Sequence, residues 1–286
     1  MLRLVLVLLG VAGTVILLVT GHRWRARSTA MVSHLAGASS GSPAYRSAEL
    51  EGLPDVVQRY FRAVLRDGQP MIRLVRLEQE GRFLLKAPDG WAPFTAVQHL
   101  SPGAPGFVWD ARIRMIPGIA AWVRDGFVDR TGSMHAAVLG LVPLVAQRGT
   151  PEIAAASLMR YLAEAVWCPT ALLPSQGVRW EAIDDSSARA SLTAGGTEVS
   201  LEFRFGSDSL VESVYSPARG RDVNGTSVPT PWQGRWFEWE ERDGMRVPVR
   251  GEVEWLLPEG PQPYWRGRVT AIRFDPEPPQ AAWAGP

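Results

Sequence analysis

The sequence contains few of the residues that carry redox, metal or nucleophilic chemistry. Its 286 residues include one cysteine, Cys168, and four histidines. A single cysteine cannot form an intrachain disulfide. The histidines show neither the HExxH motif nor another paired spacing typical of zinc sites, and the GxxxxGK[ST] phosphate-binding loop is absent. From motifs we therefore predict no catalytic residue, no metal site and no cofactor.

The chain also lacks an excess of basic residues outside its N-terminal segment. The 30 basic residues include Arg3, Arg23, Arg25 and Arg27, and the remaining 26 are set against 29 acidic residues, all beyond residue 27. Proteins that bind nucleic acids neutralise the phosphates with a basic face. The slightly acidic body therefore predicts no nucleic-acid partner.

Charge is absent from one long apolar run, LVLVLLGVAGTVILLVTG, at residues 4–21. In helical form this run extends about 27 Å at about 1.5 Å per residue, which is near the lower limit for crossing a bilayer. A cleavable signal peptide is the alternative, because Ser28-Thr29-Ala30 is small enough for cleavage. The three arginines that separate the run from Ser28 favour an uncleaved single-pass anchor over residues 1–27.

This anchor makes the lipid bilayer the predicted partner, through residues 4–21, and the cell membrane the predicted location. Arg23, Arg25 and Arg27 follow the run, whereas Arg3 and the amino terminus precede it. The positive-inside rule favours a cytoplasmic body by a margin of about one charge. The sequence therefore leaves the side of the soluble domain undecided.

Composition divides the rest of the chain into three parts. Residues 28–49 are rich in Ser, Ala and Gly, which is typical of a short tether. Residues 50–275 hold the periodic apolar segments, and we predict that they form a single domain. The Pro-rich residues 276–286, PEPPQAAWAGP, are predicted to be a disordered tail.

Within residues 50–275 the apolar pattern has two periods. A helical period predicts helices at 53–65 and 150–167, the second capped by Thr150. A period of two predicts about ten strands elsewhere, with an Asp243-Gly244 hairpin turn and no alternation of strands and helices. We predict an α+β fold: a large curled antiparallel sheet of about ten strands with two or three helices on its concave face, plus the N-terminal transmembrane helix.

Several segments together resemble an uncharacterised bacterial family known as a domain of unknown function. They are LPDVVQRYFRAVL, PGFVWDARIRMIPG, RYLAEAVWCPTALLPSQGVRWEAID and TPWQGRWFEWEERDGMRVPVRGEVEWLLPEGPQPYWRG. The likeness covers most of residues 50–275 and implies no activity and no catalytic residues. The overall layout also resembles the LolA/LppX type of lipoprotein carrier, which implies a curled antiparallel sheet with helices as a lid over a hydrophobic cavity.

The sequence is rich in tryptophan, with 12 residues. Such side chains either fill the core under a broad sheet or line an apolar pocket. Trp109 and Trp122 lie in strands before the second predicted helix, and Trp167 lies at the end of that helix. We predict that these three tryptophans line a hydrophobic cleft that binds the ligand.

The predicted function is a membrane-tethered binding module for a hydrophobic or amphiphilic ligand such as a lipid. Two alternatives remain: a membrane-associated hydrolase that uses Asp110, Asp125 or Cys168, and a scaffold for a protein partner. The period of two places Asp110 on one face with Arg112 and Arg114, which favours an ion pair on the outer face of the sheet. Cys168 has no Cys-His motif around it and is predicted to be a packed small residue.

Overall fold

The computed structural model describes residues 1–37 and 44–275. The expected tail and the middle of the expected tether, residues 38–43, lie outside this range. The helical elements are α1 (Leu2–Gly37), α2 (Asp55–Val64) and α3 (Pro151–Glu164), with 3-10 segments η1 (Ser47–Leu50), η2 (Ala165–Trp167), η3 (Pro169–Leu172) and η4 (Pro174–Gln176). The strands are β1 (Val75–Lys86), β2 (Gly90–Ser101), β3 (Gly106–Ile116), β4 (Ile119–Val128), β5 (Thr131–Val138), β6 (Val142–Arg148), β7 (Arg179–Asp184), β8 (Ser187–Ala194), β9 (Thr197–Phe205), β10 (Val211–Val223), β11 (Thr226–Arg242), β12 (Met245–Leu257) and β13 (Gly260–Phe274).

All thirteen strands of the described residues form one open antiparallel sheet, in the order β6-β5-β4-β3-β2-β1-β13-β12-β11-β10-β9-β8-β7. It consists of two meanders, β1–β6 and β7–β13, joined where β1 pairs with β13. The predicted Asp243-Gly244 turn closes the β11–β12 hairpin, with φ of 48° and 79°. The α+β fold with a large antiparallel sheet is therefore confirmed.

The sheet has more strands than the expected ten, for two local reasons. Residues 119–139 form two strands, β4 and β5, because the chain reverses at Asp129 and Arg130, whose φ angles are 50° and 59°. Neither residue is the glycine or proline that usually marks such a turn. The edge strand β6 was not predicted, and none of its residues is buried.

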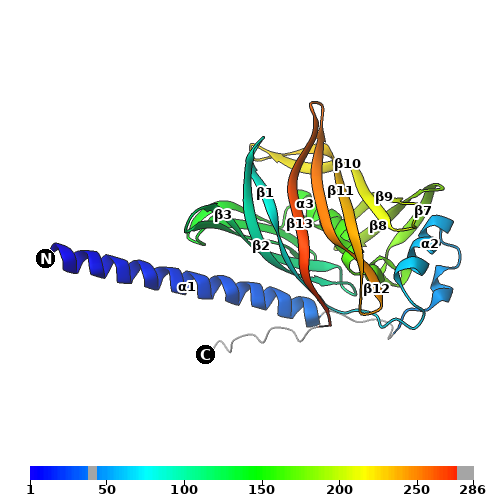
Figure 1. Cartoon of the computed structure of the whole chain (residues 1–286), viewed down its shortest axis with the longest axis horizontal. Coiled ribbons are helices and arrows are strands. Elements are labelled where there is room, and N and C mark those ends of the chain that lie inside the picture. Colours follow the sequence, from blue (N-terminus) through cyan, green and yellow to red (C-terminus); the bar gives the residue numbers. More distant parts are fainter. Residues whose placement is uncertain (38–43, 276–286) are drawn as a thin grey trace.

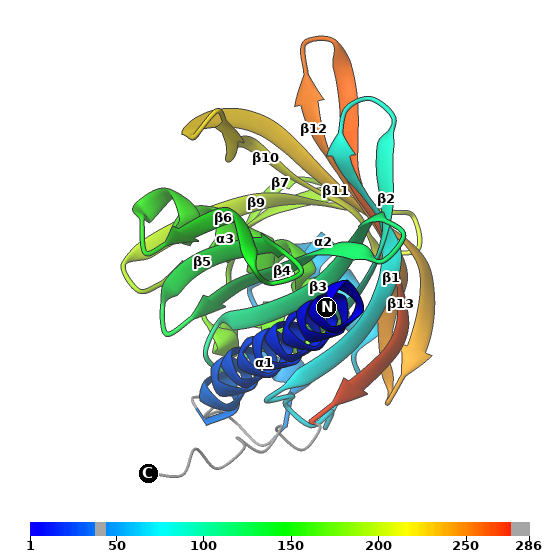
Figure 2. The same cartoon turned by 90° about the vertical axis from the view of Figure 1, so that its left-hand side faces the viewer.

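Two helices cover one face of the sheet, which we call the inner face. The helix α3 contacts β3, β4 and β5 from one meander and β9 and β10 from the other, so the ends of the sheet bend toward each other around it (Figures 1 and 2). Thr150 caps α3 as predicted, by accepting a hydrogen bond from the Ile153 amide at 3.3 Å. The helix α2 buries Tyr60 and Phe61 near Phe205 and Trp180.

The helix α1 packs on the opposite, outer face, against β2, β3 and β4 (Figure 1). Its last third, from Trp24 to Leu35, buries Trp24, Val32 and Leu35 against the sheet. The expectation of a tether that begins at residue 28 was therefore wrong for residues 28–37, because they continue α1 without a break. Among the described residues, α1 is the one helix long and apolar enough to cross a membrane.

Candidate functional site

Two of the three predicted tryptophans lie in the core between the sheet and α3. Trp109 on β3 and Trp167 in η2 are 2% and 1% exposed. The ring of Trp167 lies edge-on to Trp236 at 4.9 Å and to Trp265 at 6.5 Å. Protein side chains thus surround both residues, and neither lines the surface cavities described below.

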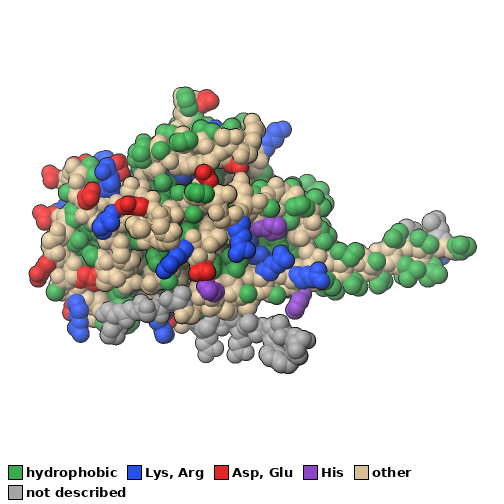
Figure 3. All heavy atoms as spheres, turned by 180° about the vertical axis from the view of Figure 1, so that it is seen from behind, with side chains coloured by type: hydrophobic (Ala, Val, Ile, Leu, Met, Phe, Trp, Pro, Cys, Tyr) green, Lys and Arg blue, Asp and Glu red, His purple; other side chains and the backbone are tan. Residues whose placement is uncertain are grey.

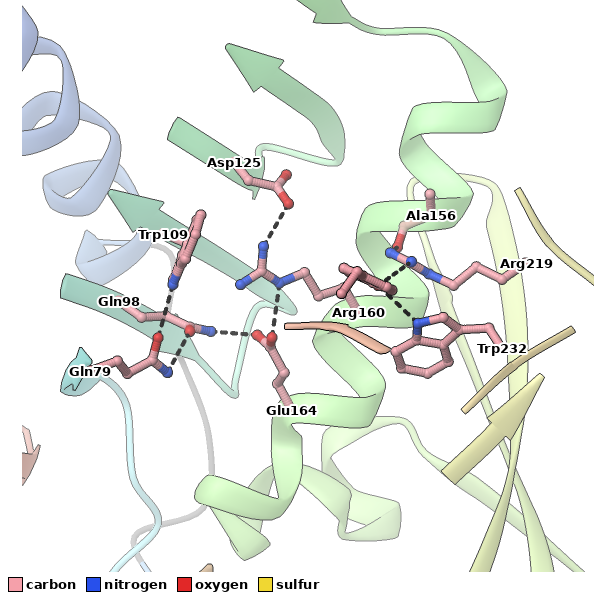
Figure 4. A network of polar contacts seen from close by, with 10 residues as sticks. Gln79, Gln98, Trp109, Asp125, Ala156, Arg160, Glu164, Arg219 and Trp232 are labelled. Carbon is pink, nitrogen blue, oxygen red and sulfur yellow. Dashed lines mark hydrogen bonds and ion pairs between the residues drawn. The ribbon is translucent and has the colours of Figure 1, made fainter. Parts of the chain in front are cut away.

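A buried polar network joins Trp109 to α3 (Figure 4). The indole of Trp109 donates to Gln79 at 2.8 Å, and Gln79 in turn donates to Gln98 at 3.2 Å. Gln98 donates to Glu164 at 2.6 Å. Arg160, one turn earlier on α3, donates to Glu164 at 2.9 Å, so the network ends in an ion pair.

Arg160 also donates to Asp125 on β4, one of the two candidate catalytic carboxylates, at 2.7 Å. Its guanidinium lies over the rings of Phe107 and Trp109, at 5.0 and 4.9 Å. Burial lowers the pKa of Arg160, but the two carboxylates outweigh it and raise the pKa above the usual value. Burial raises the pKa of Glu164, against the opposing effect of Arg160. The arrangement is a closed charge cluster that ties α3 to the sheet.

Cys168 lies in the same core and is fully buried. Burial raises the pKa of its thiol to about 12, although the thiol lies 3.3 Å from the Thr170 hydroxyl. A nucleophilic cysteine needs a lowered pKa and a basic partner. This environment disfavours the thiolate and matches the predicted packed residue.

The outer face carries a second polar cluster, where α1 crosses β3 and β4. Trp24 of α1 donates its indole N–H to both carboxylate oxygens of Asp110, at 3.1 and 2.9 Å. Asp110 also pairs with Arg112, as the alternation of the strand predicted. Arg124 donates to the Trp24 carbonyl at 2.7 Å and to the Ser28 hydroxyl at 2.8 Å. Hydrogen bonds of Asp110 and Arg124 to the last third of α1 therefore fix this helix on the sheet.

Trp122 belongs to this outer cluster. Its ring meets Trp24 edge-on at 5.7 Å, and the Arg112 guanidinium lies 4.5 Å from its centroid. In the β3–β4 register Trp122 is opposite Arg112, whereas Trp109 is opposite Asp125. The three predicted tryptophans therefore do not share one site: Trp109 and Trp167 lie on the inner face, and Trp122 lies on the outer face.

A cavity of about 360 Å³ opens beside Trp122 on the outer face. Its walls combine two arginines with apolar side chains from the β3–β4 and β5–β6 ends. It is lined by Pro93, Phe94, Thr95, Arg112, Arg114, Gly118, Ile119, Ala120, Trp122 and Leu139. We call it the junction cavity, because it lies where α1 leaves the sheet. A second hollow of about 260 Å³ lies over β1, β12 and β13, but three of its four arginines, Arg250, Arg266 and Arg268, pair with Glu238 or Glu252.

Two arginines line the junction cavity, and further basic side chains lie on the body near the point where α1 leaves it (Figure 3). Arg114 is exposed, and no ion pair joins it to a described residue. Burial, together with the smaller effects of Arg27 and Arg112 and against the opposing effect of Asp110, lowers the pKa of Arg124 to about 10. Asp110 is the acidic group that interacts with this cluster. The positive charge suits an anionic ligand.

Sequence reasoning missed Trp24, Ser28 and Arg124 as members of this site. A signal was present, because Trp24, Ser28, Val32 and Leu35 recur at helical spacing beyond the apolar run. That spacing marks one helix face that needs a partner surface.

Comparison with known proteins places residues 51–274 in a family described as a family of unknown function, DUF6920. No curated protein matches the chain. A structure described as an outer membrane lipoprotein-sorting protein domain from Vibrio parahaemolyticus is similar, with 8% identity, a TM-score of 0.43 and coverage of 78% of this chain and 92% of that one. A LolA superfamily protein from Nitrosomonas europaea is 12% identical with a TM-score of 0.41, and the match covers 78% of this chain and 93% of that one. A DUF1329 family protein from Desulfovibrio piger is 12% identical with a TM-score of 0.39, and the match covers 77% of this chain and 91% of that one.

Proposed function

The chain belongs to the DUF6920 family of unknown function, and we propose that it is a membrane-anchored binding module for an amphiphile with an anionic headgroup, such as a phospholipid. The observation that carries the proposal is the junction cavity. Arg112 and Arg114 form one wall, and Ile119, Trp122 and Leu139 contribute apolar surface. Its volume lies in the range of about 300–1,000 Å³ that is usual for small-molecule sites.

Retention of α1 as an anchor is supported by its contacts with the sheet. Cleavage near Ala30 would remove Trp24 and Ser28, which are hydrogen-bond partners of Asp110 and Arg124. Each of these hydrogen bonds involves a charged group and contributes about 1.5–3 kcal/mol, which cleavage would forfeit. The mature domain would also expose the apolar surface that Trp24 now covers. These losses favour a membrane anchor over a signal peptide.

The ligand chemistry follows from Arg114, because Arg112 is already paired with Asp110. A guanidinium binds phosphate through paired N–H groups. No carboxylate of the described residues forms an ion pair with the Arg114 guanidinium, so its N–H groups can bind a ligand. The apolar wall suits the glycerol and first methylene groups of a lipid. Of the tryptophans predicted to bind ligand, Trp122 reaches this cavity, whereas Trp109 and Trp167 would meet a ligand only if α3 separated from the sheet.

Native mass spectrometry of the full-length protein in detergent tests this function. We expect phosphatidylglycerol to remain bound in preference to phosphatidylcholine. Arg114→Gln should reduce its retention at least about tenfold, because one charge-assisted interaction contributes about 1.5–3 kcal/mol. Arg204→Gln, at an exposed position on β9, is the matched control and should have no effect.

Competition with glycerol phosphate, which has no acyl chains, distinguishes a phospholipid ligand from a free phosphate ester. Competition by this molecule at millimolar concentration would identify a free phosphate ester as the ligand. Equal retention of both lipids, with no effect of Arg114→Gln, would contradict the proposal.

A further inference from the structure

Two turns beside α1 present large apolar side chains to solvent. In the β3–β4 turn Ile116 is 56% exposed, next to Met115, and in the β5–β6 turn Val142 is 60% exposed, next to Leu141. Residues 115–123 and 136–146, which include these turns, contain no charged residue. The β1–β2, β10–β11 and β12–β13 turns differ, because they carry Asp89, Asp222 and Glu259. Soluble surfaces rarely expose such clustered apolar groups without a partner.

The contact between α1 and the sheet ends at the level of these turns. A Cβ placed on Gly140, in the β5–β6 turn, would lie 2.9 Å from the Thr20 side chain. Before Thr20 the described side chains of α1 are exposed, from Leu4 to Val19. Figure 2 looks along α1 from its N-terminus and shows these turns beside the helix. Figure 3 shows hydrophobic side chains on the body where the helix leaves it.

The length of the apolar run then determines how deep the β3–β4 and β5–β6 turns lie relative to the bilayer. Residues 4–21 extend about 27 Å, and a hydrocarbon core is about 30 Å thick. The whole run is needed to cross it, so Thr20 must lie at the hydrocarbon boundary. The β5–β6 turn, which contacts Thr20, lies at the same depth. The β3–β4 turn lies beside it, because β4 pairs with β5 and the two turns close neighbouring hairpins at the same end of the sheet.

We propose that α1 crosses the bilayer and that the β3–β4 and β5–β6 turns enter the interfacial layer of the leaflet that faces the sheet domain. The proposal rests on the anchoring part of the proposed function. Apolar side chains of the turns would lie at the acyl boundary, with Arg23, Arg25 and Arg114 at the level of the headgroups. Together with the packing of α1, this holds the sheet in one orientation, and the junction cavity opens at the membrane surface.

Nitroxide labels on single introduced cysteines measure this depth in the full-length protein. Ile116→Cys and Leu141→Cys report the two turns, and Cys168 does not compete because it is fully buried. Val11→Cys reports the anchor. Ile183→Cys, at a 44% exposed isoleucine on the edge strand β7, is the matched control. The chain is reconstituted in vesicles of phosphatidylcholine and phosphatidylglycerol, and relaxation by oxygen is compared with relaxation by a water-soluble nickel chelate.

We expect the ratio of oxygen to nickel accessibility at 116 and 141 to be several-fold above that at 183 and below that at 11. Ratios at 116 and 141 equal to the control, with residue 11 in the bilayer, would overturn this inference and leave the anchor intact. An aqueous residue 11 would overturn the anchor as well. Low access to both reagents, with spin–spin broadening that disappears on dilution with unlabelled chain, would identify a second copy as the occupant and also overturn the inference.

Discussion

Replacement of Arg160 by methionine tests whether the interior of the sheet is a closed core. The substitution keeps much of the side-chain volume but removes the cation that pairs with Asp125 and Glu164. Breaking a buried ion pair from one side costs about 3–5 kcal/mol, because the remaining charge stays desolvated. Contacts with the Phe107 and Trp109 rings contribute about 1–2 kcal/mol more. Since Glu164 already has a raised pKa and can take up a proton, we expect a net loss of about 4 kcal/mol.

The loss is measured by urea unfolding of the full-length protein in detergent, followed by tryptophan fluorescence. Without Arg160 the folded-state pKa of Glu164 rises further above its unfolded value, so stability falls as pH rises from the unfolded to the folded pKa, and the deficit should be larger at pH 8 than at pH 5. The combined variant Asp125→Asn/Arg160→Met/Glu164→Gln should recover much of the loss, because no charge remains buried. Arg189→Met, which breaks the exposed pair with Glu202, should change stability by less than about 1 kcal/mol. A loss below about 1 kcal/mol for Arg160→Met would refute the reasoning, since it would mean that water reaches the cluster.

Three further predictions concern the outer face and the core. Trp24→Ala should cost about 3–5 kcal/mol of α1 docking and speed hydrogen exchange in residues 24–35, while exchange in α3 stays unchanged. Burial lowers the pKa of His99 to about 4, so the unfolded chain takes up a proton at higher pH than the native chain does. The free energy of unfolding should therefore fall by about 3 kcal/mol between pH 6.5 and 4. In unfolding measured as a function of pH, His99→Gln should reduce this fall. A thiol reagent should label Cys168 only after unfolding, and rapid labelling of the native chain would contradict its burial.

Local patterns in the sequence predicted most of the sheet. The strand β9 (Thr197–Phe205) alternates cleanly, and the Asp243-Gly244 turn is specific for a hairpin. The Asp129-Arg130 reversal was not visible, because tertiary pairing places these two residues at positive φ without a glycine. The tether prediction was wrong for the last part of α1, because packing on the sheet, which composition does not report, stabilises residues 28–37 as a helix.

The arrangement of the tryptophans depended on one local irregularity. A simple two-residue turn at Pro117-Gly118 would place Trp109 and Trp122 on the same face of the sheet. The register instead shifts by one residue between Arg114 and Ile116, and a shift of one reverses the face. Trp109 therefore points into the core, and Trp122 points toward α1. Alternation alone cannot predict such a bulge, so the sequence placed both residues in one cleft.

The intact mass of the protein, purified in mild detergent from the membranes of its native cell, tests the central claim most directly. The account predicts a polypeptide that still carries residues 1–30, with a bound anionic phospholipid whose retention falls at least about tenfold in Arg114→Gln. A chain that begins near Ala30, or a full-length chain that carries no phospholipid, would contradict it.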